Sequence, residues 1–131
     1  MKIVFIAGPY SGDGTVECIE SNIREAERFQ IELANRQIGF FCGHNHTEHF
    51  STKKGSTASD DFFYELDLQF LFRAADAVLA MPGWEASLGA RREVEWAQNK
   101  GMVIFFPRDP HDMEEIVEWT LAQRGLGPCL D

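Results

Sequence analysis

Three glutamates lie in the segment PGWEASLGARREVEWA at residues 82–97, and helical geometry separates them. The segment predicts a helix from about residue 86 with an apolar stripe at Ala90, Val94 and Ala97. Glu93 falls about 60° from the centre of that stripe, whereas Glu95 falls about 140° away, toward solvent. Helical side chains lean toward the N-terminus, so Glu93 is directed to the end where a ligand would bind. Glu93 is therefore either a candidate nucleophile or a partly exposed structural glutamate.

A second carboxylate stands out in the predicted helix at about residues 59–75. Asp67 falls about 60° from Phe70, within an apolar stripe of Phe63, Leu66, Phe70 and Ala74. An aspartate there is costly unless it is paired, protonated or solvated by a pocket. Burial would raise its pKa and suit a general acid, although pairing within the scaffold is the alternative. Two carboxylates flanking a pocket indicate glycoside chemistry, in which one attacks the anomeric carbon and the other protonates the leaving group.

Two further segments contain candidate substrate contacts. The glycine-rich sequence GPYSGDG at residues 8–14 is typical of a loop that binds phosphate or sugar, with contacts from Gly8, Pro9, Ser11 and Gly12. An ordinary strand-to-helix turn also needs glycines, and neither a Walker GK[ST] nor a GxGxxG pattern follows.

Near the start of the helix at residue 86, Ser87 and Gly89 are candidate ligands. Ser87 either caps the helix or helps its dipole to bind a phosphate. The preceding Trp84 either packs on the helix as a lid or stacks on a base.

A polar segment, GHNHTEHF, begins at residue 43 and predicts a loop. Its HxHxxH spacing is compatible with a metal site, so a metal-dependent hydrolase is one hypothesis. No other ligand cluster accompanies it, and we expect neither a metal nor another cofactor. Asn45 and His49 are instead candidate contacts to a base or sugar, with histidines of no special role as the alternative.

Strands alternate with helices along the chain, and this order must position the candidate residues. The runs KIVFIAG, IGFFC, DAVLAM and MVIFF predict strands, and helices are expected at about 17–36, 59–75, 86–100 and 111–125. The pattern predicts an α/β three-layer sandwich, with a parallel, flavodoxin-like or Rossmann-like sheet of four to five strands, in one domain over residues 1–131. Ligands bind at the carboxyl ends of such strands.

Composition limits the partners and the compartment. The net charge of −9 argues against binding along a nucleic-acid polymer, but not against a single nucleotide. Three cysteines without a CxxC motif favour a reducing compartment. The N-terminal apolar run at residues 3–7 is too short for a signal peptide or a membrane span. We expect a cytoplasmic protein that binds a small molecule and no membrane.

The motifs IAGPYSG at residues 6–12 and PGWEASLGARRE at residues 82–93 together resemble the nucleoside 2-deoxyribosyltransferase superfamily. The chain is also similar to nucleoside 5′-monophosphate N-glycosidases, and the resemblance extends to about residue 106. It implies cleavage or transfer at an N-glycosidic bond. Glu93 matches the position of the glutamate that attacks C1′ of the sugar. Asp67, in DLQFL, matches the aspartate that assists the leaving base.

The resemblance also bears on the substrate and on assembly. Relatives that act on 5′-monophosphates carry a serine where Ser87 stands, and a hydroxyl is not repelled by a phosphate as a carboxylate is. Phe5 stands where relatives often have a tyrosine that orients the nucleophile, which leaves Tyr10 as the nearest candidate for that role. Glu95 stands where the transferases have a glycine after the nucleophile, a change that alters helix packing and bears on the quaternary arrangement. Members of that family form dimers or larger assemblies, so the resemblance implies a homodimer or a higher homo-oligomer. A non-catalytic nucleotide-binding module of the same fold is the alternative function.

Overall fold

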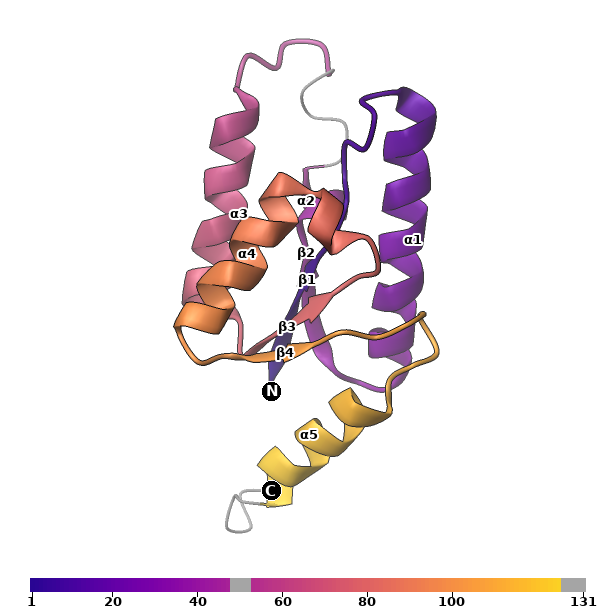
Figure 1. The fold of residues 1–131 in the computed structure, drawn as a ribbon, viewed down its shortest axis with the longest axis vertical. Coiled ribbons are helices and arrows are strands. Elements are labelled where there is room, and N and C mark those ends of the chain that lie inside the picture. The colour runs from indigo at the N-terminus through magenta and orange to yellow at the C-terminus, as the bar shows by residue number, and fades with distance from the viewer. Residues whose placement is uncertain (48–52, 126–131) are drawn as a thin grey trace.

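A parallel sheet forms the centre of the computed structural model, which describes residues 1–47 and 53–125 (Figure 1). Within these residues the sheet has four strands: β1 Ile3–Ala7, β2 Gly39–Cys42, β3 Ala77–Ala80 and β4 Val103–Phe105. Every neighbouring pair is parallel, and the strand order is β2-β1-β3-β4. The predicted parallel α/β sheet is therefore confirmed, with four strands.

The helices follow the predicted order with one addition. They are α1 Val16–Asn35, α2 Gly43–His46, α3 Asp60–Ala74, α4 Leu88–Asn99 and α5 Glu114–Gly125, with a 3₁₀ turn at Trp84–Ala86. The addition is α2, in the segment predicted as a loop, because four residues are too few to show a helical apolar pattern. No helix in the described ranges is long and apolar enough to cross a membrane.

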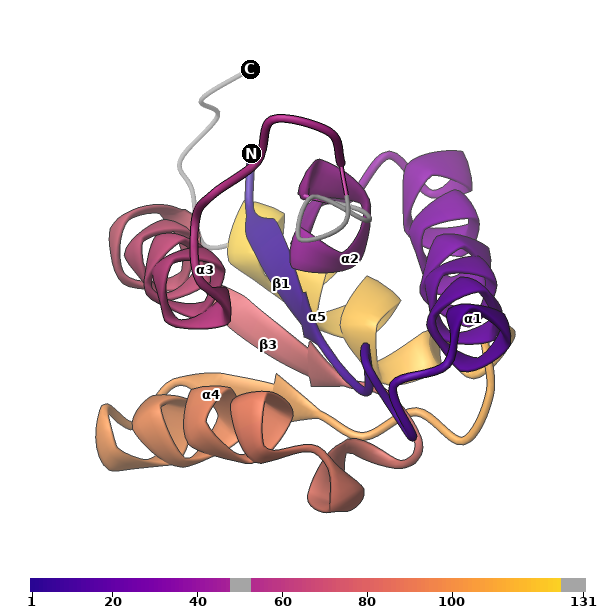
Figure 2. The same cartoon turned by 90° about the horizontal axis from the view of Figure 1, so that it is seen from above.

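Both faces of the sheet are buried beneath helices (Figure 2). Val4 and Ile6 of β1 join a core with α1 and α5, whereas Phe5 and Ala7 join a second core with α3 and α4. Burial on both faces explains why the strands read as continuous apolar runs in the sequence. The result is the expected three-layer sandwich.

The α3 helix packs along a different line from the predicted stripe. Leu71 is its only fully buried residue among those described, and Ala74, which was expected in the stripe, is exposed. Phe63 and Asp67, on the same side of the helix, border a cavity, whereas Phe70 packs against the core. Periodicity identified the inner side of α3 but not what that side faces.

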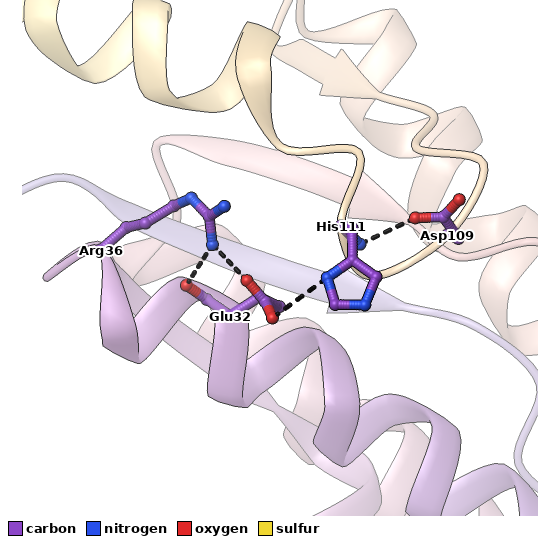
Figure 3. Close-up of polar contacts among 4 residues, drawn as sticks. All are labelled: Glu32, Arg36, Asp109 and His111. Atoms are coloured by element: carbon purple, nitrogen blue, oxygen red, sulfur yellow. Dashed lines mark hydrogen bonds and ion pairs between the residues drawn. The ribbon is translucent and has the colours of Figure 1, made fainter.

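A polar contact joins the C-terminal part of α1 to the connection between β4 and α5 (Figure 3). Glu32 is bonded to Arg36 one turn later, and one of its carboxylate oxygens lies 3.4 Å from His111 Nδ1. The backbone N–H of His111 donates to Asp109 Oδ1 at 2.8 Å. A glutamate on this helix is thus held by partners from two parts of the chain.

Candidate active site

The candidate site lies at the carboxyl end of β1, which has β2 on one side and β3 on the other, because the chain passes from β1 to β2 and then crosses back over β1 to β3. Neighbouring strands diverge in their connections at such a point, and a crevice forms at their carboxyl ends. A cavity of about 730 Å³ occupies this position. Its walls come from the loop at 8–14 after β1, from α2 after β2, and from residues 86–90 after β3, together with α3 and α4.

Glu93 lines this cavity from α4 and is 7% exposed. The residues predicted to form the stripe of α4 are all buried, and Glu95 is exposed, so the predicted helical phase is confirmed. Burial, and then the negative charge of Asp67, raise the pKa of Glu93 well above its ordinary value. Within the described part of the chain, no hydrogen bond or cation lowers that pKa. As far as the structure describes the chain, Glu93 is therefore a buried acid without a counter-ion.

Asp67 reaches the same cavity from α3. Its Oδ1 atom is buried and has no hydrogen-bond partner among the described residues, and burial raises its pKa to about 6. The side chain lies close against Gly43, the first residue of α2, where an added Cβ would stand 2.7 Å from Asp67 Cγ. Gly43 is therefore required for the carboxyl group to occupy this position.

The two carboxyl groups act on each other electrostatically, because the charge of Asp67 contributes to the raised pKa of Glu93. Neighbouring acids in a poorly solvated site do not both ionise readily, and their titration belongs to the pair. Near neutral pH the pair can hold one proton and one negative charge. That combination provides an acid and a nucleophile in one cavity.

Tyr64 is a cavity residue that the sequence analysis did not identify. Burial, followed by the charge of Glu93, raises the pKa of Tyr64, and the Arg92 guanidinium lies 5.4 Å from the centre of its ring. A Cβ on Gly89 would stand 3.6 Å from the same ring, which is ordinary contact. The available signal was spacing, since Tyr64 precedes Asp67 by three residues and so shares its side of the helix.

Tyr10 also lines the cavity, from the turn after β1. Its ring makes an edge contact with the ring of His44, with 5.4 Å between centroids. His44 is buried, and its Nε2 is bonded to the carbonyl oxygen of Pro9. Burial lowers the pKa of His44, so the imidazole is neutral and Nε2–H donates this bond. His44 therefore fixes the position of the 8–14 loop over α2.

The histidine segment shows no metal-binding geometry in the part of the chain that the structure describes. No group of three or more His, Cys, Asp or Glu side chains there could hold a metal ion. His46 packs near the rings of Phe41 and Phe70, at 5.4 and 5.2 Å between centroids. The predicted contact His49 lies outside the described residues.

Most of the predicted substrate contacts meet in the cavity. They are Gly8, Pro9, Ser11, Gly12, Ser87 and Gly89. Of the described candidates, Asn45 and Trp84 lie outside the cavity lining. Asn45 Oδ1 accepts a hydrogen bond from Gln30, and Trp84 packs near Phe106 with 5.7 Å between ring centroids. Trp84 is partly buried, and both of its alternative roles remain predictions.

Further cavity residues were not among the predicted contacts. Besides Tyr64 they include Phe63 and Asp60 of α3, and Gly43, His44 and Thr47 after β2. Spacing from Asp67 along the helix would have indicated Phe63 and Asp60. The α2 residues follow a strand end, and that position was the available signal for them.

Residues 2–108 match the model of a family described as a domain of unknown function, DUF1937. The matched range covers most of the chain and includes every residue named above as lining the cavity. No curated protein matches the chain.

Proposed function

The chain belongs to the DUF1937 family, and we propose that it cleaves or transfers the N-glycosidic bond of a nucleotide or nucleoside. One observation carries this proposal: Glu93 is buried beside Asp67, with no counter-ion among the described residues, in a cavity at the carboxyl ends of the strands. Buried unpaired charge is costly, and strongly perturbed acids in a cleft are typical of functional sites. The resemblance of both sequence motifs to the deoxyribosyltransferase superfamily supports the same reaction.

In the proposed reaction the Glu93 carboxylate attacks C1′ of the sugar. The C1′–N bond breaks as the glycosyl ester forms, and Asp67 donates its proton to the departing base nitrogen. Water, or a second base, then attacks C1′ and releases Glu93. Asp67 takes up the proton of this second nucleophile. The charge of Asp67 raises the pKa of Glu93 and so favours the shared proton on Glu93 at rest; the proposed reaction starts from the form in which that proton has moved to Asp67.

The sugar and its 5′ substituent are assigned to the part of the cavity formed by the 8–14 loop and the start of α4. Ser87 Oγ accepts a hydrogen bond from the Ala90 N–H at 3.2 Å as the helix cap. A hydroxyl that accepts still has its own hydrogen to donate, and a helix N-terminus favours an anion. Gly12 adopts φ +55°, where its backbone turns tightly beside Cys18. These features favour a 5′-monophosphate over a free nucleoside.

A chromatographic screen tests the proposal. Nucleosides and their 5′-monophosphates, in ribo and deoxy forms, are incubated with and without an acceptor base. Glu93→Gln is compared with Glu95→Gln, because Glu95 is an exposed glutamate on the same helix. Release of free base by the wild type and Glu95→Gln, but not by Glu93→Gln, is expected.

Two results would contradict the proposal. Equal turnover by the two variants would remove Glu93 from the chemistry. Tight nucleotide binding without any turnover across the panel would instead indicate a non-catalytic nucleotide-binding module.

A further inference from the structure

The cavity has an unusual balance of charge among its described lining residues. Asp60, Asp67 and Glu93 supply carboxyl groups, and neither lysine nor arginine contributes to this lining. His44 is neutral because its burial lowers its pKa. The nearby Arg92 is exposed and contacts the ring of Tyr64 without lining the cavity. The described lining of the cavity therefore holds no cationic side chain to balance these acids.

Aromatic side chains line the same cavity. They are Phe5, Tyr10, Phe63 and Tyr64. The face of an aromatic ring attracts a cation electrostatically, and more strongly when the cation is desolvated. Aromatic rings and carboxyl groups that share one cavity are the combination that recognises a flat organic cation. The buried Oδ1 of Asp67, without a partner in the described chain, gives a definite atom for such a ligand to contact.

We propose that this cavity selects glycosides whose heteroaromatic base carries a positive charge, such as N-glycosylated pyridiniums or N-alkylated purines. The inference rests on the proposed function and specifies its substrate class. A cationic base supplies the missing counter-ion to Asp67 and Glu93, and its proximity favours the ionised form of Glu93 that attack requires. When C1′–N breaks, the bonding electron pair passes to the ring nitrogen and neutralises it. The leaving base then needs no proton from Asp67.

Probes without a glycosidic bond test the charge preference apart from turnover. The cation 1-methylnicotinamide and 3-methylbenzamide have the same shape, but the second has carbon in place of the charged nitrogen. We expect NMR titration of the wild type to give at least about tenfold tighter binding of the cation, a ratio typical of desolvated cation–π and ion contacts. Asp67→Asn and Glu93→Gln should each reduce this ratio toward one. Asp61→Asn, at an exposed position of α3, should leave it unchanged.

Equal binding of the two probes by the wild type would overturn the inference. A cation preference that survives both Asp67→Asn and Glu93→Gln would also overturn it, since the cation would then bind elsewhere. Circular dichroism verifies that each variant is folded, and either of the two cavity variants suffices for the test. Turnover of neutral nucleosides without cation preference would leave the proposed function intact and refute this inference. Cation preference without turnover of any glycoside would refute the proposed function and leave the charge preference of the cavity intact.

Discussion

Glu32 and Glu93 are both helical glutamates shielded from water, yet their surroundings are opposite. The Glu32 side chain is 19% exposed, forms an ion pair with Arg36 and lies 3.4 Å from His111 Nδ1 (Figure 3). Glu93 is 7% exposed, and the charged group that acts on it is another carboxylate, that of Asp67. Glu32, which joins two elements, therefore has basic partners, whereas Glu93 at the cavity has none among the described residues. That contrast separates a structural acid from a candidate functional one.

The largest effect is expected from Glu93→Gln. Without a nucleophilic carboxylate, turnover should fall by at least about 10³-fold, if the proposed reaction is correct. The free energy of unfolding near neutral pH should rise by about 1 kcal/mol or more, because the raised pKa of Glu93 means that its ionisation favours the unfolded state, and glutamine has no such ionisation. Activity assays and urea denaturation measure the two quantities. Loss of both activity and stability would mean that Glu93 is a structural acid like Glu32.

Asp67→Asn tests the other half of the pair. As the proposed general acid, Asp67 should contribute about 10²-fold or more to kcat/KM for substrates with a neutral base. The wild-type rate should rise with pH as the pair loses its first proton and fall as it loses the second. The falling limb should disappear in Asp67→Asn, since no second proton remains to be lost. A pH profile with both limbs unchanged would contradict the assignment.

The same variant should change the pH dependence of stability. The folded pKa of Asp67 is raised from an ordinary 3.8 to about 6, so the folded state binds this proton more tightly than the unfolded state. Its contribution is therefore complete below about pH 4 and is lost as pH rises through about 6. Urea denaturation between pH 4 and pH 7 should show a smaller decline in Asp67→Asn than in the wild type.

Gly43→Ala should have an intermediate effect on stability. The new Cβ would overlap the Asp67 carboxyl group, so we expect a loss of about 1–3 kcal/mol. Gly89→Ala is a matched control, because its Cβ would make ordinary contact with the Tyr64 ring. The double variant Gly43→Ala with Asp67→Ala should recover much of the loss in a thermodynamic cycle. If the effects of the two changes on the free energy of unfolding were additive, the close approach of the new Cβ to Asp67 would not be the cause of the lost stability.

The same contrast shows what the sequence could predict. The four parallel strands followed from apolar runs buried on both faces, and the positions of Glu93 and Glu95 followed from helical phase within one element. Tyr64 and Gly43 were missed because their importance depends on packing between elements. The α2 helix was missed because it is too short to show a period. The contact of Trp84 with Phe106 was missed for the same reason, since the two rings lie on segments far apart in the sequence.

The smallest effect is expected from Glu32→Gln. Its partners are partly exposed, with 36% of the Arg36 side chain and 77% of the His111 side chain accessible, so solvent screens the interaction. The free energy of unfolding should fall by less than about 1 kcal/mol, and the difference should shrink at high salt. Activity should not change, because Glu32 is remote from the cavity lining. A loss of turnover comparable with that of Glu93→Gln would show that pairing and burial do not distinguish structural from functional acids in this fold.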